Sequence, residues 1–468
     1  MKKKLLTLMV VLVAIFMGTS TASAHDFVFE GIYYNILDDT SVEVTFCDTD
    51  KEYVGKVDVP SEVIGTDGTT YRVIGIGEEA FAYCYELEEV TLPQTLEIIK
   101  WEAFFDCPML NSIVIPASVA TIENNVFGYC YGLSSIKVDA KNTVYDSRNN
   151  CNAIIETATN TLVAGCLSTN IPTTVEKLGD SSFFGIFWEL EEPVEIAIPE
   201  GVTELGVDAF CGCTSLAKIS LPSTLTKVGM YAFYDCPMLN SIVIPASVTT
   251  FESYVFVYCS NLKSVVVEEG NPVYDSRNNC NAIIETATNT LVAGCINTVI
   301  PTTVEKLGDF SFYGIFSRLE EPVEIAIPEG VTELGVEVFG YCESLAKISL
   351  PSTITGIGNN CFLECAGLEE IVCYDETPCV LIDDVFTAVP ETAVLRIPAG
   401  TKDAYLANGW DSFPGTIVED DTLTGVESVK AEENAPVEYY NLQGVKVACP
   451  ENGMYIKKQG GRTSKVVL

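Results

Sequence analysis

One pattern of 23 residues recurs along this chain and limits its fold more than any other feature. Each copy follows the order Ala-Phe-x-x-Cys-x-x-Leu-x-x-Ile-x-Leu-Pro, and ten coils of this kind fill residues 71–368. One copy is too short to bury its own apolar face, so stacked copies must share a continuous core. The pattern therefore predicts a solenoid. Its phenylalanines include Phe81, Phe104, Phe127, Phe210, Phe233, Phe256, Phe339 and Phe362.

The end of each copy alternates apolar and polar residues, which is typical of a short strand. Val90 and Leu92 are expected to point inward and Thr91 outward. The proline that follows has no backbone N–H and ends the strand. We interpret the Ala-Phe-x-x-Cys run as a short helical or 3₁₀ turn. The expected fold class is an α/β repeat solenoid, curved, with parallel strands stacked along one face.

A longer duplication includes several of these coils. Residues 106–119 are identical to 235–248, an offset of 129 residues, so 97–225 was copied as 226–354. Each copy contains an insertion, which spans 146–166 in the first. Two β-rich arms flank residues 157–160, and we predict a hairpin there.

The regions outside the repeat suggest an exported protein. Three lysines, a short apolar run and an Ala-Ser-Ala site predict a signal peptide over residues 1–24. No other stretch is apolar over the length of a membrane span, so no membrane insertion is expected. We expect an extracellular or outer-surface location. The predicted segments are a small β-rich cap (25–70), the solenoid (71–398), a C-terminal cap (399–418), an acidic linker (419–436) and a β module (437–468).

The charge balance narrows the classes of partner. The formal net charge is −39, and loss of the three leader lysines makes it −42. Such a surface repels nucleic acid and anionic membranes, so neither is an expected partner. It suits solubility, cationic partners or divalent cations. No EF-hand or nonapeptide calcium pattern occurs, and we predict no metal or cofactor.

The residues that most enzymes need are scarce. His25 is the only histidine, which leaves no basis for Ser-His-Asp catalysis, Cys-His catalysis or a histidine zinc site. No glycine-rich phosphate loop is present. The 65 acidic residues leave a two-carboxylate hydrolase open as an alternative. We predict that the protein is not an enzyme.

Eighteen cysteines in an exported chain raise the question of disulfides. Eight of them occupy the repeated coil position, which Ile186 and Ile315 take in two variant coils. We interpret these cysteines as small buried apolar side chains.

The cysteines of the insertions form a separate case. If Glu156 faces Thr161 across the hairpin, an unbroken register places Cys151 opposite Cys166. Opposed positions of this kind can meet disulfide geometry, so a disulfide and two free thiols both remain open. The same arrangement recurs in the second copy at Cys280 and Cys295.

The outward strand positions form the candidate binding face. Val243 and Val266 lie on adjacent coils, and an exposed apolar pair on an acidic surface can mark a contact site. Single exposed valines are also common on strands, so a purely structural interpretation stays open. The positions are Thr91, Val114, Lys137, Ala197, Ser220, Val243, Val266, Ala326 and Ser349.

The repeat resembles the BspA-like leucine-rich repeat family of bacterial surface proteins over residues 71–398. Residues 29–36 and the insertion from Tyr145 resemble segments of its secreted members. The resemblance implies adhesion, with host matrix proteins or cell-surface proteins as ligands. The leading prediction is an adhesin. The alternatives are a structural or self-associating surface scaffold and a carbohydrate-active enzyme.

The end of the chain carries a second resemblance. Residues 439–447, 453–456 and 465–468 resemble the short C-terminal sorting domains of the type IX secretion system. This resemblance implies export across the outer membrane and possible attachment at the surface. A small terminal β domain is the alternative.

Overall fold

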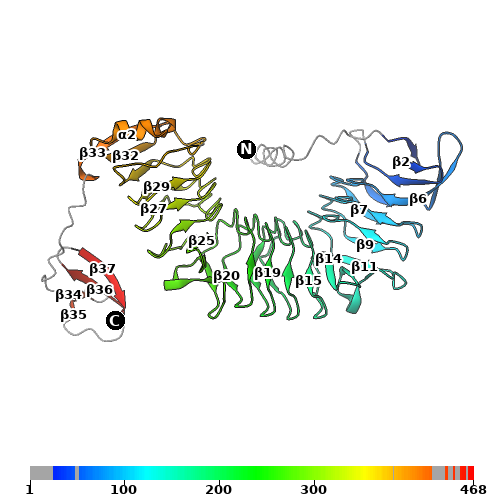
Figure 1. Cartoon of the computed structure of the whole chain (residues 1–468). Coiled ribbons are helices and arrows are strands. Elements are labelled where there is room, and N and C mark those ends of the chain that lie inside the picture. Colours follow the sequence, from blue (N-terminus) through cyan, green and yellow to red (C-terminus); the bar gives the residue numbers. More distant parts are fainter. Residues whose placement is uncertain are drawn as a thin grey trace.

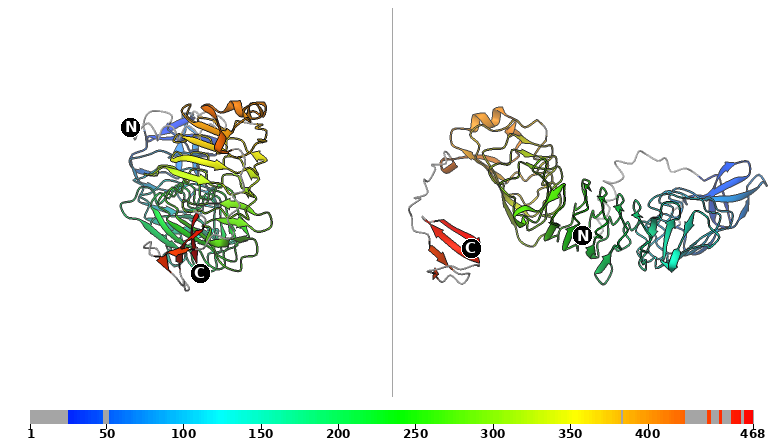
Figure 2. Two further views of the ribbon diagram at one scale, coloured as in Figure 1. Left: turned by 90° about the vertical axis from the view of Figure 1, so that its left-hand side faces the viewer. Right: turned by 60° about the horizontal axis from the view of Figure 1, so that its bottom comes forward.

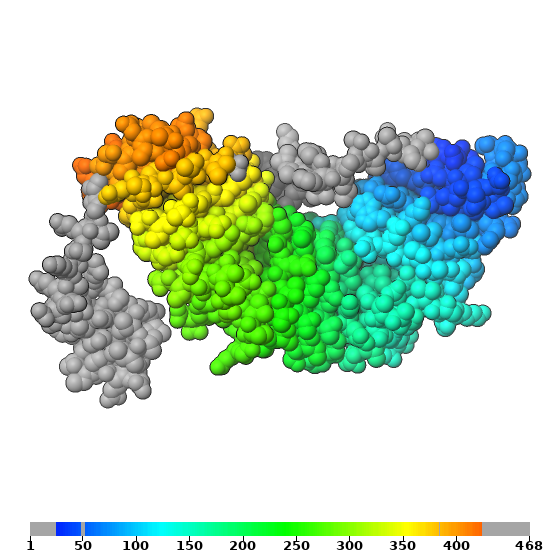
Figure 3. All heavy atoms as spheres, in the orientation of Figure 1, coloured from blue at the N-terminus to red at the C-terminus, as the bar shows by residue number. Residues whose placement is uncertain are grey.

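The computed structural model describes residues 25–47, 52–382 and 384–423, and the backbone of four strands between 438 and 467. The predicted signal peptide (1–24) and residues 424–436 of the predicted linker lie outside the described residues. Residues 25–423 form a curved stack of coils, an arch when seen from the side (Figure 1) and in the space-filling view (Figure 3). Viewed from the end of the arch, successive coils project over one another (Figure 2). The predicted curved solenoid is confirmed.

The Leu-x-x-Ile-x-Leu segments form parallel strands in three sheets, here called the long-strand sheets. The first contains β4 (Gly55–Asp58), β7 (Leu87–Thr91), β9 (Ser112–Ile115) and β11 (Ser135–Val138). The second contains β16 (Val194–Ala197), β18 (Leu216–Ser220), β20 (Ser241–Ile244) and β22 (Ser264–Val267). The third contains β27 (Val323–Ala326), β29 (Leu345–Leu350), β31 (Glu370–Cys373), β32 (Val394–Pro398) and β33 (Thr416–Asp420).

Strands of two residues form the other side of each coil, with one side chain buried in most of them. In the first part of the chain they are β8 (Ile98–Ile99), β10 (Thr121–Ile122), β15 (Lys177–Leu178), β17 (Glu204–Leu205) and β19 (Lys227–Val228). Further along they are β21 (Thr250–Phe251), β26 (Lys306–Leu307), β28 (Glu333–Leu334) and β30 (Gly356–Ile357). Their pairing is parallel, with each inward residue placed beside that of the next coil.

The Ala-Phe-x-x-Cys run is not the helical or 3₁₀ turn that we predicted. Glu79 and Tyr83 adopt the left-handed conformation, with φ of 53° and 61°. The N–H of Phe81 donates to the carbonyl of Ala103 and the N–H of Tyr83 to that of Phe105, both at 2.8 Å. Alternate amides therefore point along the solenoid axis to the next coil, whereas a helix directs them back along its own chain. The fold is a parallel-strand β-solenoid of about 15 turns with little helix, which corrects the α/β assignment.

The repeated phenylalanines and cysteines fill the core. The rings of Phe81 and Phe104 stack at 5.1 Å with an interplanar angle of 1°. The Sγ of Cys107 donates to the carbonyl of Phe81 at 3.0 Å. The coil cysteines are buried free thiols, as predicted, and they also link neighbouring coils through hydrogen bonds. Equivalent bonds of 2.9–3.2 Å come from Cys130, Cys213, Cys236, Cys259, Cys342 and Cys365.

The insertions form the predicted hairpins and become part of the solenoid. In the first copy β13 (Ala153–Glu156) pairs with β14 (Thr161–Gly165), and β14 then pairs in parallel with β15. The second copy repeats this with β24 (Ile283–Glu285) and β25 (Thr290–Ala293). A Cβ on Gly165 would lie 2.2 Å from the ring of Phe183. Only glycine lets this ring pack directly on the inner arm of the hairpin.

The first end of the solenoid is covered by a small sheet of β1 (Phe27–Phe29), β2 (Ile32–Asp38), β3 (Ser41–Val44), β5 (Glu62–Ile64) and β6 (Thr70–Ile76). A 2.7 Å ion pair between Glu43 and Lys100 joins this sheet to the coils. The parallel ladder already begins at β4, inside the region predicted as cap.

The ladder ends later than predicted. β32 is followed by α2 (Lys402–Ala407), the 3₁₀ turn η3 (Trp410–Ser412) and β33, which continues the third long-strand sheet to Asp420. The turn η4 (Asp421–Leu423) follows. In the C-terminal module β34 (Glu438–Tyr440), β35 (Lys446–Val447), β36 (Met454–Gln459) and β37 (Arg462–Val467) form an antiparallel sheet.

Candidate binding surface

The outward positions of the long-strand sheets are accessible. Val114 is 55% exposed, Val243 51% and Val266 40%. These values are high for valine, which proteins usually bury. Among the other predicted positions Thr91, Lys137, Ala197, Ser220 and Ala326 are exposed and Ser349 is half-buried.

The strand register brings some of these residues together. Val243 lies directly opposite Val266 on the adjacent coil, as the sequence indicates. Val114 lies opposite Lys137. The predicted positions do not form one unbroken row, because the first sheet ends at β11 and the second at β22, and a hairpin insertion follows each. The face consists of three panels, one on each long-strand sheet.

Ion pairs between coils accompany these positions on the same face. Lys56 pairs with Glu89 at 2.5 Å, and Lys218 with Glu195 at 3.6 Å. In the third panel Glu370 holds both Lys347 and Arg396. Exposed pairs of this kind contribute little to stability, but they neutralise much of the local charge. In the second panel the Lys218–Glu195 pair lies on β18 and β16, whereas Ser241 and Ser264 precede Val243 and Val266 on their own strands.

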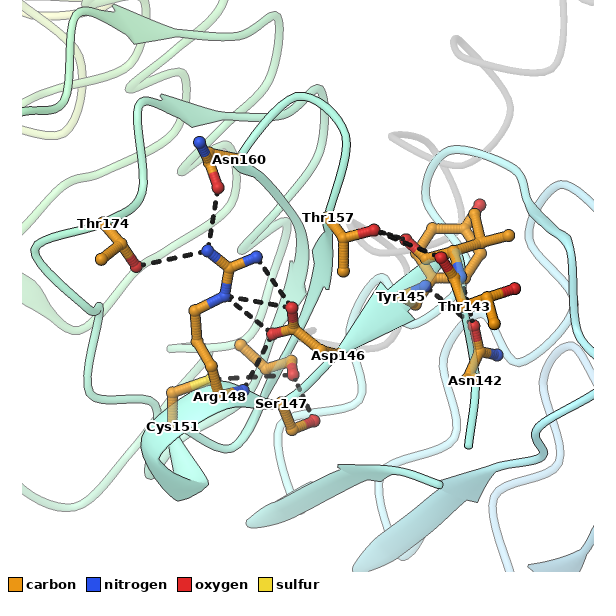
Figure 4. A network of polar contacts seen from close by, with 12 residues as sticks. Asn142, Thr143, Tyr145, Asp146, Ser147, Arg148, Cys151, Thr157, Asn160 and Thr174 are labelled. Atoms are coloured by element: carbon orange, nitrogen blue, oxygen red, sulfur yellow. Dashed lines mark hydrogen bonds and ion pairs between the residues drawn. The ribbon is translucent and has the colours of Figure 1, made fainter. Parts of the chain in front are cut away.

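A polar network fixes the loop before each hairpin (Figure 4). It follows β12 (Tyr145–Asp146) and includes the turn η1 (Arg148–Asn150). The guanidinium of Arg148 binds Asp146 at 2.8 Å and donates to Asn160 at 2.8 Å. The amide of Asn160 donates to Glu176 at 2.9 Å, so the network reaches the next coil. The second copy repeats it with Asp275, Arg277, Asn289 and Glu305. Sequence reasoning missed this network, although an identical Asp-Ser-Arg triplet in both insertions was available as a signal.

The cysteines of the insertions are buried free thiols in the structure. Glu156 does pair with Thr161, but a bulge between Ile154 and Ile155 shifts the register by one residue. The unbroken register that placed Cys151 opposite Cys166 is therefore wrong. The Sγ of Cys166 donates to the carbonyl of Asn152 at 3.2 Å. Cys280 and Cys295 follow the same pattern, with a bulge at Ile283.

An open depression of about 320 Å³ lies beside the first hairpin. Glu156, Asp180 and Glu204 contribute carboxylates to its lining, together with Lys177. Glu204 is held by Lys177 at 3.0 Å and by Lys227 at 3.2 Å, so its charge is already compensated. The depression is polar, and its acids are tied to neighbouring groups.

A connected set of aromatic rings on the turns was not among the predicted site residues. We call it the aromatic edge and define it as Tyr231, Tyr254, Tyr258, Phe310 and Tyr313. All five are half-buried. The available signal was a difference between the two duplicated blocks, since three of these rings replace polar residues two positions before the core phenylalanine.

Two negative observations concern the described residues only. No group of three or more His, Cys, Asp or Glu side chains gathers there as a metal site would require. No helix in the same part of the chain has the length and apolar character needed to cross a bilayer.

Parallel strands stacked coil on coil, with regularly spaced Leu and Ile inside, define a leucine-rich repeat solenoid. The chain belongs to the BspA type leucine-rich repeat family: the family's repeat region matches in six copies over residues 69–185, 185–290 and 292–387. This is a family of cell-surface repeat proteins, which typically act as non-enzymatic protein-binding modules.

Several solved structures resemble the chain at low identity. A leucine-rich cell surface protein of Faecalibacterium prausnitzii is 19% identical, with a TM-score of 0.42 over 86% of this chain and 97% of that one. A leucine-rich repeat protein of Bacteroides ovatus is 22% identical, with a TM-score of 0.35 over 84% and 100%. The pneumococcal vaccine antigen PcpA is 15% identical, with a TM-score of 0.36 over 86% and 100%. No curated protein matches the chain.

Proposed function

We propose that this protein is an exported adhesin that binds host matrix proteins or proteins of other cells. The family supports a protein-binding module, and the observation that carries the proposal is the Val243–Val266 pair. Two exposed valines in direct register on adjacent strands form a small apolar patch. Such a patch on an otherwise acidic surface favours contact with another protein.

Binding of the mature chain to immobilised matrix proteins tests this proposal. The double variant V243S/V266S removes the apolar pair and leaves the strands in place, because both side chains point outward. We expect it to lose most of the binding. Val114→Ser is the matched control, since Val114 is equally exposed but lies opposite Lys137.

Two outcomes contradict the adhesin. Absence of binding to every matrix or cell-surface protein, together with concentration-dependent assembly in sedimentation, would establish a self-associating scaffold instead. Turnover of any member of a glycan panel would favour a carbohydrate-active enzyme.

We further propose that residues 437–468 direct export across the outer membrane and surface attachment. The support is their resemblance to sorting domains and the antiparallel sheet that they form. Cells expressing a chain truncated after Asp421 should retain it in the periplasm, while the full chain reaches the surface. Equal surface display of both chains would contradict this role.

A further inference from the structure

The two copies of the 129-residue block differ in one row of the turns. The row is the left-handed position two residues before the core phenylalanine. Three of its four residues change from polar to aromatic, whereas Asp208 and its counterpart Glu337 are both acidic. Glu102, Asn125 and Ser181 in the first copy correspond to Tyr231, Tyr254 and Phe310 in the second. The second copy therefore has three rings on this row that the first lacks.

The three new rings form a continuous strip with Tyr258 and Tyr313, whose counterparts Tyr129 and Phe184 are aromatic in the first copy too. The ring centroids of Tyr231 and Tyr254 lie 4.9 Å apart, and those of Tyr254 and Phe310 3.9 Å apart. Phe310 contacts Tyr313 at 6.0 Å, and Tyr313 contacts Tyr258 at 5.7 Å. Half-buried aromatic side chains offer a large contact area with little loss of conformational entropy on binding.

The backbone makes these rings costly. Tyr231, Tyr254 and Phe310 have φ of 57°, 62° and 58°. This left-handed region is unfavourable for bulky side chains and is tolerated best by glycine and asparagine. Asn125 occupies the equivalent position in the first copy, with φ of 59°. Tyr83, Tyr129 and Tyr341 are left-handed elsewhere in the turns, so the conformation belongs to the coil, and the case for a site rests on the ring contacts and the nearby carboxyl groups.

Three acidic residues, Asp208, Asp309 and Glu337, lie near the strip, and burial raises the pKa of the Asp208 carboxyl to about 6. Burial raises the pKa of Tyr254 to about 12, with further contributions from Tyr231, Glu337 and Asp309 nearby. Burial also raises the pKa of Tyr231, and Asp208 adds to the effect. Among the described residues, no lysine or arginine forms an ion pair with Asp208, Asp309 or Glu337. The strip thus combines aromatic faces with acidic groups that no basic side chain neutralises.

We propose that the aromatic edge binds arginine side chains of a partner protein. A guanidinium stacks on aromatic faces while it donates hydrogen bonds to carboxylates, and a lysine ammonium stacks less well. Aromatic clusters of this kind are typical hot spots of protein interfaces. The net charge of −39 attracts cationic segments over longer distances. This proposal rests on the proposed protein-binding function and adds the turns of the second copy as a contact surface.

The test uses the full mature chain and synthetic peptides in which glycine alternates with arginine or with lysine. The triple variant Y231E/Y254N/F310S carries the residues that the first copy has at the same positions, so these residues are compatible with the fold. We expect calorimetry to show about tenfold weaker binding of the arginine peptide to the variant. The lysine peptide should bind the wild type about tenfold more weakly than the arginine peptide.

The variant also separates stacking from charge. Y231E adds a negative charge, so a purely electrostatic site would bind the arginine peptide more tightly in the variant. The reciprocal variant E102Y/N125Y/S181F should create a second site and double the binding stoichiometry. Circular dichroism and melting temperature establish that each variant is folded.

Three results would overturn the proposal: unchanged binding in the triple variant, equal affinity for the two peptides, or a neutral oligosaccharide that binds only when the rings are present. The last would identify a carbohydrate platform. If V243S/V266S loses binding to matrix proteins while the triple variant keeps it, the adhesin proposal stands and the aromatic edge fails. If no protein ligand is captured but the peptides discriminate as expected, the adhesin proposal alone fails.

Discussion

Glu102 is a carboxyl group buried on the turns of the first copy, with 8% of its surface exposed. Burial raises its pKa to about 7, although a hydrogen bond from Asn125 acts in the opposite direction. Its value in the absence of the fold is 4.5. The folded state therefore binds the proton more strongly than the unfolded state. The contribution of Glu102 to stability is therefore greatest at pH values below its pKa in the unfolded state. It is lost as the pH rises through its pKa in the folded state.

We expect Glu102→Gln to raise the free energy of unfolding by about 1–3 kcal/mol at roughly pH 8 and to change it little at roughly pH 4. Glutamine keeps the hydrogen-bond acceptor and removes the charge. Urea unfolding at both pH values measures the difference. Glu88→Gln, at an exposed position, is the control. An equal gain at both pH values would show that burial of the charge is not the cause.

The thiols of the hairpins provide a second test at this scale. The thiol of Cys166 donates a hydrogen bond to the carbonyl of Asn152. The bulge also shifts the register so that Cys166 does not lie opposite Cys151. We expect both thiols to stay reduced in the exported protein. Alkylation of the denatured, unreduced chain followed by peptide mass spectrometry should find all four hairpin cysteines modified. A disulfide-linked peptide pair containing Cys151 and Cys166 would contradict this expectation and would indicate the unbroken register.

The sequence predicts which residues are buried and does not predict what their polar atoms do. A period of 23 residues is enough to place Phe104 and Cys107 inside the solenoid. It contains no information on the direction of the Cys107 thiol, because a buried cysteine can equally well have no partner. The bulge between Ile154 and Ile155 also cannot be predicted from the sequence. Both arms of the hairpin have the same apolar residues whether or not the register shifts by one.

At the scale of elements, the strands were predictable and the turns were not. The Leu-x-x-Ile-x-Leu alternation identifies β7 directly. The left-handed conformation of Tyr83, in the turn just before β7, arises from stacking, since the N–H groups must reach the next coil's carbonyls. Tyrosine has no intrinsic preference for that conformation, so no local sequence signal reveals it.

The hairpins depend on the arginine networks, and Arg148→Met should loosen the first one. The variant loses the bonds to Asp146 and Asn160, so the loop is no longer tied to the Asn160–Glu176 pair. We expect a loss of about 1–2 kcal/mol of stability and faster amide hydrogen exchange in β13 and β14. Arg277→Met is the matched variant. It should affect β24 and β25 and leave the first hairpin unchanged, and a global response to either substitution would contradict this local role.

For the whole molecule, the duplication was visible in the sequence, while its division into panels was not. The identity of 106–119 and 235–248 shows that a block was copied. The strands of consecutive blocks join into one sheet only if the hairpin between them lets the pairing continue. That depends on contacts between coils, which the sequence of one block does not reveal. The same limitation applies to the aromatic edge, because Tyr254 and Phe310 are 56 residues apart and meet only in the folded chain.

Deletion of residues 226–354 should yield a shorter, folded solenoid. Thr226 and Thr355 each donate their N–H to a threonine carbonyl of the preceding coil at 2.8 Å, so Thr355 can replace Thr226 at the new junction. We expect a cooperative melt and a smaller maximum dimension in solution scattering. The variant lacks the aromatic edge and should not discriminate arginine from lysine peptides. Aggregation or a molten circular dichroism spectrum would show that the two blocks are not interchangeable.

The amides of the turns have a consequence for the whole assembly. In coil after coil the N–H groups that cross to a neighbour point toward the C-terminal end, from Phe81 at one end to Glu364 at the other. Peptide dipoles that are aligned in this way add together, as they do along a helix. This side of the solenoid therefore carries an electrical polarity, with its positive pole at the C-terminal coils. On the short-strand side the crossing N–H groups point the other way, for example from Glu97 to Ile74 and from Glu123 to Ile99. Copying the block therefore lengthened two opposed rows of dipoles, and a charged partner meets a different polarity on each side of the solenoid.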